Sequence, residues 1–455
     1  MIDVKRLRTA VLALVLAPLA ACSSVPNPMD AFDFLSGGNE DSDTAPTDGR
    51  VSILSFEQTL QISTDADIPA VTLPPAYVNT VWPQPGGYPT HALQHTQASG
   101  DLAVAWRQSV GQGSNNDRRL NARPVIADGH IFAGDATGQI SARDAETGQE
   151  VWSVRLELPN RYDRMSFGSG LAHDSGRVFA HTGFNFFVAL DAATGAEVWR
   201  TETLVPFHGA PTVADGRVFV TSDDNELLAL DAATGSVLWT YQGIVETARL
   251  LTGPSPAVLG DIVVAPFASG ELVALRVQNG NPVWSDSLTR GAGLTAMSEI
   301  NDVAGSPVIL DGTVYAMSHS GTLVAIELRT GERIWTQPAG GLHTPWVAGD
   351  FLYVTTSEAE LVCLNRNTGV VHWITQLDLF ENPNRRKHRI AWAGPVLAGG
   401  RVFLASSSGD GVLVNAYDGE IIRQFSLGAT VFVAPVIANE TVYVVTDEAR
   451  LLALR

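Results

Sequence analysis

Short β-rich apolar runs recur along the chain from about residue 101 to the C-terminus, and pairs of them flank two-residue turn signals. Runs separated by such turn signals are typical of β-hairpins. The turn pairs are Asp128-Gly129, Ser175-Gly176, Asp215-Gly216, Gly260-Asp261, Asp311-Gly312, Gly349-Asp350, Gly399-Gly400 and Asn439-Glu440. The pattern therefore predicts eight successive hairpins, and no helical periodicity fits it.

One of these units shows the predicted strand order. The strands are expected, from the innermost outwards, at Pro211–Ala214, Arg217–Thr221, Glu226–Leu230 and Ser236–Tyr241. The Asp-Ala-Ala-Thr-Gly sequence before the last strand supplies an aspartate to hydrogen-bond the turn backbone and a glycine for a positive φ. Four antiparallel strands in about 45 residues are the unit of a β-propeller blade.

A longer repeat covers the outer part of each unit. Ala189–Trp199 recurs almost unchanged at Ala229–Trp239. Weaker copies end in the glycine/aromatic pairs Gly148/Trp152, Gly280/Trp284, Gly331/Trp335, Gly369/Trp373 and Gly419/Phe425. In the last copy the aromatic lies six residues after the glycine instead of four, which predicts an insertion or a shifted register. We expect the aromatic rings to wedge between neighbouring blades, where their large apolar area is covered.

The last unit lacks a fourth strand because the chain stops at Leu451–Arg455. The segment Ala103–Arg107, which precedes the first hairpin and carries the unassigned aromatic Trp106, can supply that strand. Such closure removes the sheet edges that an open ring would expose. The predicted fold is therefore all-β: an eight-bladed β-propeller of four-stranded antiparallel blades, closed by an N-terminal strand that completes the last blade. Seven blades are the alternative.

The composition is typical of a large folded chain, and the net charge argues against one class of partner. Of the 455 residues 45% are hydrophobic and 17% are charged, which excludes wholesale disorder, collagen and coiled coil. The 48 acidic and 29 basic residues give a formal net charge of −19. A protein that depends on phosphate contacts is not expected to be so acidic, so nucleic acid is a poor partner.

The N-terminus has the features of a processed export signal. Basic residues precede the apolar run Val11–Ala20, which ends at Leu19-Ala20-Ala21-Cys22. The run is too short to span a bilayer, which needs about 20 residues. Leu-Ala-Ala-Cys resembles the bacterial lipobox, in which the cysteine is acylated, so Cys22 is the expected lipidation site. An ordinary secretory signal with a chance cysteine is the alternative.

We expect three parts of the chain: a lipoprotein signal peptide at 1–21, a flexible acidic tether at 22–80 and the propeller at 81–455. The tether is rich in Asp, Ser, Thr, Pro and Gly, and such a composition cannot bury enough apolar area to fold alone. In lipoproteins of this kind Ser23, in place of Asp, points to the outer membrane. The expected location is therefore the periplasmic face of the outer membrane, with a lipid anchor.

The Asp/Asn-x-x-Thr-Gly-x-x-x-Trp copies, preceded by Trp82–Gly87, resemble the repeats of pyrroloquinoline quinone dehydrogenases and their non-enzymatic relatives. Together with the lipobox and the eight units, they resemble the BamB family of β-barrel assembly lipoproteins. This resemblance implies a non-enzymatic periplasmic scaffold that assists folding and insertion of outer-membrane β-barrel proteins. The implied partners are the barrel-forming subunit with its periplasmic domains and, as a further expectation, unfolded outer-membrane clients.

The resemblance also implies where the partner binds. The family's partner-facing loops align with Thr247–Thr252 and Ser298–Val303, and the candidate residues are Arg249, Leu250, Leu251, Ile300 and Asp302. Asp302 matches the first acid of the family's Asp-x-Asp pair, and Ala304 replaces the second. Apolar residues on long surface loops are typical of a docking patch with a polar rim. The alternative is that they pack back onto their own blade.

Two other classes of function remain open at this point: a quinone-dependent dehydrogenase and a small-molecule-binding envelope propeller. Quinone enzymes resembling this chain use adjacent cysteines, whereas the only cysteines are Cys22 and Cys363, and the latter is expected in a buried inner strand. The sequence predicts no catalytic residue, no cofactor and no metal site. His343 is expected to be a loop or core residue, and Asp223–Asn225 a turn. The basic cluster Arg385–Arg389 is expected either to meet an acidic partner or lipid headgroups, or to be simply solvated.

Overall fold

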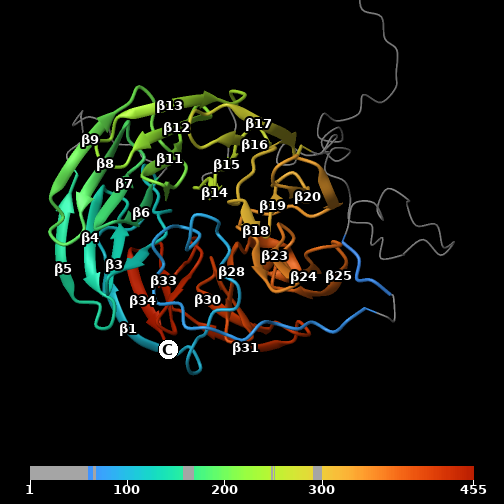
Figure 1. The fold of residues 1–455 in the computed structure, drawn as a ribbon. Helices are drawn as coiled ribbons and strands as arrows, with labels where there is room; N and C mark the ends of the chain where they lie inside the picture. The colour runs from blue at the N-terminus through green and yellow to red at the C-terminus, as the bar shows by residue number, and fades with distance from the viewer. Residues whose placement is uncertain (1–59, 65–67, 157–168, 247–249, 251, 290–299) are drawn as a thin grey trace, which may run out of the picture. The chain divides into compact units, whose positions relative to one another are not determined.

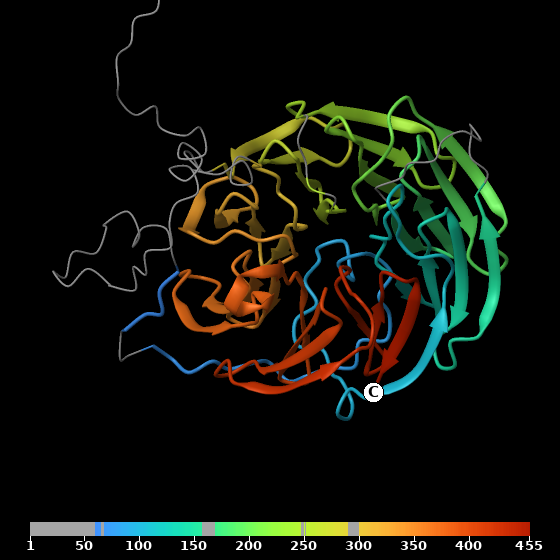
Figure 2. The same cartoon turned by 180° about the vertical axis from the view of Figure 1, so that it is seen from behind.

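The computed structural model describes residues 60–64, 68–156, 169–246, 250, 252–289 and 300–455. Within these residues the strands form eight four-stranded antiparallel sheets and one two-stranded sheet. The large sheets stand side by side around a central axis (Figures 1 and 2). The chain therefore forms an eight-bladed β-propeller, which confirms the predicted fold and excludes the seven-bladed alternative.

The first four blades each contain four consecutive strands, hydrogen-bonded in chain order from the axis outwards. Blade 1 contains β2 (Val125–Ala127), β3 (His130–Gly134), β4 (Gln139–Asp144) and β5 (Glu150–Arg155). Blade 2 contains β6 (Gly170–Asp174), β7 (Arg177–His181), β8 (Phe186–Asp191) and β9 (Glu197–Glu202). Blade 3 contains β10 (Thr212–Ala214), β11 (Arg217–Thr221), β12 (Glu226–Asp231) and β13 (Val237–Gln242). Blade 4 contains β14 (Ala257–Leu259), β15 (Ile262–Pro266), β16 (Glu271–Arg276) and β17 (Pro282–Ser287).

The remaining blades follow the same order, apart from a small insertion after blade 6 and the closure of blade 8. Blade 5 contains β18 (Val308–Leu310), β19 (Thr313–Met317), β20 (Leu323–Glu327) and β21 (Arg333–Gln337). Blade 6 contains β22 (Trp346–Ala348), β23 (Phe351–Thr355), β24 (Glu360–Asn365) and β25 (Val371–Gln376). The insertion contains β26 (Phe380–Asn382), the 3₁₀ turn η2 (Pro383–Arg385) and β27 (Lys387–Arg389). Blade 7 contains β28 (Trp392–Ala398), β29 (Arg401–Ser406), β30 (Asp410–Asn415) and β31 (Ile421–Ser426), and blade 8 contains β32 (Val436–Ala438), β33 (Thr441–Val445), β34 (Arg450–Leu454) and β1 (Val104–Ser109).

The two ends of the propeller meet in blade 8. β1 pairs antiparallel with β34, with Val104 opposite Leu454 and Arg107 opposite Leu452. The backbones of Ala103 and Arg455 add two reciprocal hydrogen bonds of 2.7 and 2.9 Å. The predicted closure by the segment around Trp106 is therefore confirmed.

The core lies largely between blades. One apolar cluster joins Val308 and Tyr315 of blade 5 to Leu352 and Val362 of blade 6, and all four side chains are buried. Facing sheets bury apolar area in this way around the ring, and burial of such side chains is the main stabilising contribution to a fold of this kind. Among the residues described here, no helix is long and apolar enough to cross a membrane.

The outer turn of each repeat packs on the tryptophan of the preceding blade. In blade 3 the Asp231 carboxylate accepts from the backbone N–H of Thr234 at 2.8 Å, and Gly235 has a φ of 75°. A Cβ on Gly235 would lie 2.5 Å from the ring of Trp199, whose Nε1–H donates to the carbonyl of Ala232 at 3.1 Å. The same contact recurs in the pairs Gly148/Trp106, Gly195/Trp152, Gly280/Trp239, Gly331/Trp284, Gly369/Trp335 and Gly419/Trp373. The tryptophans therefore wedge between blades, as predicted.

Because of this contact, the repeat glycine should contribute measurably to the free energy of unfolding. Replacing Gly235 with alanine should impose a strained φ and also displace Trp199, with an expected loss of about 3 kcal/mol. Gly216 is the matched control, because its φ is 71° but no atom lies within 4 Å of its Cβ position. Gly216→Ala should cost about 1 kcal/mol. Urea unfolding measures both losses, and equal losses would show that the inter-blade contact contributes nothing.

The last copy of the repeat corrects one expectation. β30 and β31 pair with Leu413 opposite Arg423, just as Ala229 pairs with Trp239 in blade 3. Blade 7 thus has neither an insertion nor a shifted register. Arg423 occupies the position of the tryptophan, and its guanidinium lies 4.3 Å from the ring centroid of Phe425. The aromatic ring is supplied by Phe425, two residues later, an arrangement that spacing alone could not distinguish from an insertion.

Some residues that precede the predicted propeller boundary at residue 81 belong to the described structure. Val71 is buried, and the Ser63 N–H donates to the carbonyl of Val371 at 3.1 Å. Ser63 and Val71, in the segment assigned to the tether, therefore contact the propeller. The proposed lipidation site Cys22 lies outside the described residues.

Candidate functional site

The two predicted partner-binding segments lie on the connections that flank blade 4. Leu250 is in the β13–β14 connection, and Ile300 and Asp302 are in the β17–β18 connection. The backbone N–H of Leu250 donates to Oδ2 of Asp302 at 2.9 Å. The structure therefore brings these two segments together, whereas Arg249 and Leu251 fall outside the part of the chain that it describes.

Asp302 is buried, and its contacts inside the protein fix the position of its loop. Asp302 is only 4% exposed. Its backbone carbonyl accepts from the N–H of His319 at 2.9 Å. The next residue, Val303, is also buried. A Cβ on Gly270 would lie 2.8 Å from the carbonyl oxygen of Asn301, so the loop lies close against blade 4. In this arrangement Asp302 positions Leu250 and does not present a carboxylate to solvent.

Three exposed apolar residues lie on the neighbouring connections and were not predicted as site residues. Leu204, in the β9–β10 connection, is 99% exposed, and Ile244 and Val245, at the start of the β13–β14 connection, are more than 60% exposed. We call these three residues the blade 3 loop patch. Large apolar side chains so fully exposed are typical of interaction surfaces. The three residues lie in short apolar stretches, Leu204–Phe207 and Ile244–Val245, and such stretches do not reveal from sequence alone whether they are buried or exposed.

The turn Asp223–Asn225 lies between the two connections of this patch. The N–H of Asp223 donates to the carbonyl of Pro206 at 2.8 Å, and the side-chain amide of Asn225 donates to the carbonyl of Ile244 at 2.7 Å. The segment forms a turn, as predicted. Its role is to hold the two patch-bearing connections on the same end of blade 3.

A segment that precedes the first blade crosses the middle of the ring, which was not predicted from the sequence. Residues 79–99, which we call the axial strap, run across the inner ends of the blades and appear as the blue segment at the centre of Figures 1 and 2. The strap makes one or two hydrogen bonds to the innermost strand of each blade, or to the turn that follows that strand. In strap order the contacts are Asn79 with Ile437 and Asn439, Trp82 with Ile126, Pro83 with His173, Gln84 with Val213, Pro89 with Val258, Thr90 with Ile309, Gln94 with Trp346 and Gly349, and Thr96 with Leu397 and Gly399.

The strap visits all eight blades in ring order, starting at blade 8 and ending at blade 7. Ser99 then returns to blade 8, where its N–H donates to the carbonyl of Glu440 at 3.0 Å. The inner edge of each sheet would otherwise expose unpaired backbone groups to the axis. The strap pairs with some of these backbone groups, and it links the eight blades to one another at the axis.

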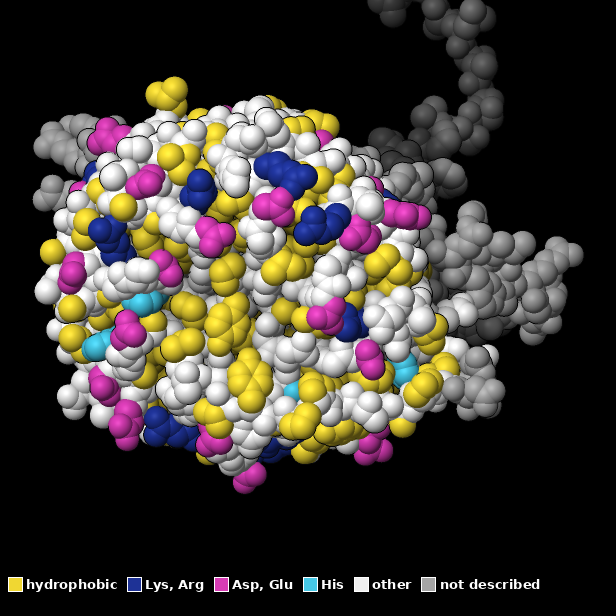
Figure 3. All heavy atoms as spheres, in the orientation of Figure 1, with side chains coloured by type: hydrophobic (Ala, Val, Ile, Leu, Met, Phe, Trp, Pro, Cys, Tyr) yellow, Lys and Arg dark blue, Asp and Glu magenta, His cyan; other side chains and the backbone are white. Residues whose placement is uncertain are grey.

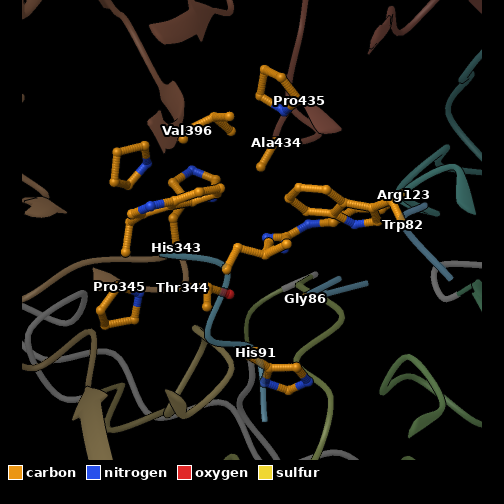
Figure 4. A pocket seen from close by; sticks show the side chains of 14 residues that line it. Trp82, Gly86, His91, Arg123, His343, Thr344, Pro345, Val396, Ala434 and Pro435 are labelled. Atoms are coloured by element: carbon orange, nitrogen blue, oxygen red, sulfur yellow. The ribbon is translucent and has the colours of Figure 1, made fainter. Parts of the chain in front are cut away.

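A small axial cavity lies between the strap and the inner ends of blades 6 to 8 (Figure 4). Its volume is about 20 Å³, which holds about one water molecule. Residues of the strap, of the loop before β2 and of the inner blade ends line it: Trp82, Gly86, His91, Leu93, Arg123, His343, Thr344, Pro345, Trp346, Gly394, Pro395, Val396, Ala434 and Pro435.

The two histidines beside the cavity are neutral. His91 bonds through Nδ1 to the carbonyl of Pro307 at 2.7 Å and through Nε2 to the hydroxyl of Ser255 at 3.2 Å. Burial, with a smaller contribution from the charge of Arg123, lowers the pKa of His91 to about 4. The same two causes lower the pKa of His343 to about 3. Neither was predicted as a ligand, and His91 serves as a buried polar group.

The basic cluster and the cysteine that were considered from the sequence are neither among the residues that line the axial cavity nor in the partner-binding segments. The basic cluster Arg385–Arg389 forms the exposed β26–β27 insertion, anchored by an ion pair of 3.2 Å between Arg389 and Glu358. Cys363 is buried on β24, the third strand of blade 6, and burial raises the pKa of its thiol. Within the described ranges no three His, Cys, Asp or Glu side chains are grouped as metal ligands would be. On the face shown in Figure 3, acidic, basic and apolar side chains are interspersed.

Eight four-stranded blades, five of them with a Thr-Gly outer turn, and tryptophans packed between blades define a β-propeller built from repeats of the pyrroloquinoline-quinone-like type. A family model described as "Outer membrane protein assembly factor BamB" matches residues 95–164, 136–375 and 382–455. The chain therefore belongs to the BamB family.

Individual relatives agree with this assignment. The assembly factor BamB of Legionella pneumophila is 33% identical over 359 residues, covering 79% of this chain and 89% of the relative. BamB of Salmonella typhimurium is 30% identical over 355 residues, covering 77% and 88%.

Solved structures show the same fold. BamB from Moraxella catarrhalis superposes with a TM-score of 0.66 at 19% identity, covering 78% of this chain and 99% of that one. Quinohemoprotein alcohol dehydrogenase from Comamonas testosteroni superposes with a TM-score of 0.64 at 15% identity, covering 83% and 81%. At these identities the likeness concerns the fold alone, which non-enzymatic and enzymatic proteins share.

Proposed function

We propose that this chain is a non-enzymatic scaffold lipoprotein of the β-barrel assembly machinery, acting at the periplasmic face of the outer membrane. The observation that carries the proposal is the family match across the whole propeller, with relatives that bear the name of assembly factor. Acylation of Cys22 would provide the anchor, and several acyl chains hold a protein durably on a membrane. The N-terminal part of the chain up to residue 59 would link that anchor to the propeller.

The partner surface is the loop end of blades 3 and 4. Leu250, held in place by Asp302, would contact the barrel-forming subunit together with Arg249, Leu251 and Ile300. The blade 3 loop patch extends this surface, because Ile244 and Leu250 belong to the same connection. Apolar anchors within a polar rim are what a protein–protein contact requires. Unfolded clients would add to exposed outer strands by backbone pairing.

The geometry of the axis supports a scaffold over a quinone enzyme. The strap crosses the centre of the ring, and the cavity beside it has a volume of about 20 Å³, far below the 300 Å³ or more that is typical of a cofactor site. Its lining contains neither a carboxylate nor a cysteine. A small-molecule envelope propeller is disfavoured by the same dimensions.

A membrane pull-down through the native anchor tests the partner surface. Leu250→Glu should reduce recovery of the barrel-forming subunit at least tenfold, because a charge is buried in the contact. Leu259→Glu is the matched control: Leu259 lies at the far end of β14 in the same blade and is 39% exposed. The control should recover the subunit as the wild type does. Equal recovery by both variants would mean that the loop end of blade 4 is not the contact.

A further inference from the structure

The axial cavity contains a cationic group with no acidic partner. Arg123, from the loop before β2, extends beside Trp82 into the cavity (Figure 4). Its guanidinium donates through Nη1 to the carbonyl of Pro85 in the strap at 3.1 Å, and no ion pair joins it to any described residue. A guanidinium has five N–H donors, so most of its hydrogen-bonding capacity is left for another acceptor.

The surroundings of Arg123 supply no negative charge. The lining of the cavity contains no Asp or Glu, and His91 and His343 are neutral. Desolvation by the surrounding protein lowers the pKa of Arg123 to about 10, so the side chain is still charged at neutral pH. A desolvated charge is strongly unfavourable unless an opposite charge pairs with it.

A second donor and the shape of the cavity define the missing partner. The Thr344 hydroxyl oxygen accepts from the N–H of Ser306 at 3.3 Å, which leaves its own O–H to donate. The rings of Trp82 and Trp346, with centroids 6.1 Å apart, form apolar walls. A volume of about 20 Å³ accommodates a single-atom ion.

We propose that the axial cavity binds a small monovalent anion of halide size between the Arg123 guanidinium and the Thr344 hydroxyl. The anion neutralises Arg123, which bonds the strap, and so it stabilises the strap within the ring. This site is separate from the partner surface at the loop end of blades 3 and 4.

Crystals of the full chain grown or soaked in bromide test the site directly. We expect an anomalous bromide peak in hydrogen-bond contact with the Arg123 guanidinium. Absence of a peak there, in crystals that show bromide elsewhere, would overturn the proposal.

Thermal unfolding of the full chain in chloride, with gluconate keeping ionic strength constant, tests the site in solution. The midpoint should rise by about 2 °C for each tenfold increase in chloride above half saturation. Arg123→Gln should abolish the dependence, whereas Arg177→Gln should retain it, because Arg177 also donates to carbonyls, those of Ala232 and Ala233, but far from the cavity. If Arg123→Gln does not fold, Thr344→Val should weaken the dependence in its place. A bromide peak without chloride dependence of the wild type would mean binding at crystal concentration only and would overturn the proposal.

Discussion

Replacing Trp82 with alanine should destabilise the propeller by about 4 kcal/mol, because a buried tryptophan leaves a large cavity when it is truncated. Trp82 is 2% exposed, and its backbone N–H and carbonyl both pair with Ile126 at 2.7 Å. Its ring also packs on Trp346 across the axis. The variant should therefore loosen the strap where it meets blades 1 and 6. Urea unfolding gives the loss of stability.

Hydrogen exchange can show that this loss acts through the strap. The amides of His173, Val213, Val258 and Ile309 all donate to strap acceptors, and they should exchange faster in Trp82→Ala. Val78→Ala is the matched control, since Val78 lies just before the strap and is 48% exposed. It should cost less than about 1 kcal/mol. Unchanged exchange at these amides in Trp82→Ala would contradict a stabilising role of the strap.

Acid should destabilise the protein between about pH 6.5 and pH 4 because of its buried neutral histidines. Burial lowers the pKa of His91 and of His181 to about 4, below the ordinary value of about 6.5 that each regains on unfolding. In that window the unfolded chain binds protons that the folded chain does not, so the free energy of unfolding falls as pH falls. Above pH 6.5 this contribution is fully present. Each histidine should lose roughly 3 kcal/mol by pH 4.

His181 allows the cause to be isolated. Its Nε2–H donates to the carbonyl of Gly209 at 2.8 Å, and its Nδ1 is enclosed without a hydrogen-bond partner among the described residues. His181→Gln should therefore reduce the pH dependence of urea unfolding between pH 7 and 5 by the contribution of one histidine, whereas His388→Gln, on the exposed β26–β27 insertion, should leave the slope unchanged. An unchanged slope in His181→Gln would show that other groups govern acid stability.

The blades were predictable from sequence because their signals are local and repeated. In blade 3 the four predicted strands agree with β10–β13 to within one residue at each end. A hairpin turn or an Asp-x-x-Thr-Gly turn fixes backbone geometry over a few residues, and eight copies make each signal stronger. Ring closure followed from counting strands, since one blade lacked its fourth.

The strap and the axial cavity were not predictable in the same way. Residues 79–99 contain Pro, Gly and polar residues without a strand period, and their partners are spread over eight blades. Arg123 gives no local sign that it faces the axis. The site residues taken from the family resemblance remain a prediction, and nothing in the sequence indicated that Asp302 is buried and accepts from the N–H of Leu250, 52 residues away. Long-range contacts of this kind are decided by the assembled ring.

Site-specific photocrosslinking in cells tests most directly whether the loop end of blade 4 contacts the assembly machinery. A photoreactive amino acid would replace Leu250 or, as the control in the same blade, Leu259. Irradiation should yield an adduct with the barrel-forming subunit from position 250 and none from position 259. An adduct from position 259 alone, or none from position 250 in a folded, membrane-anchored variant, would contradict the proposed scaffold contact.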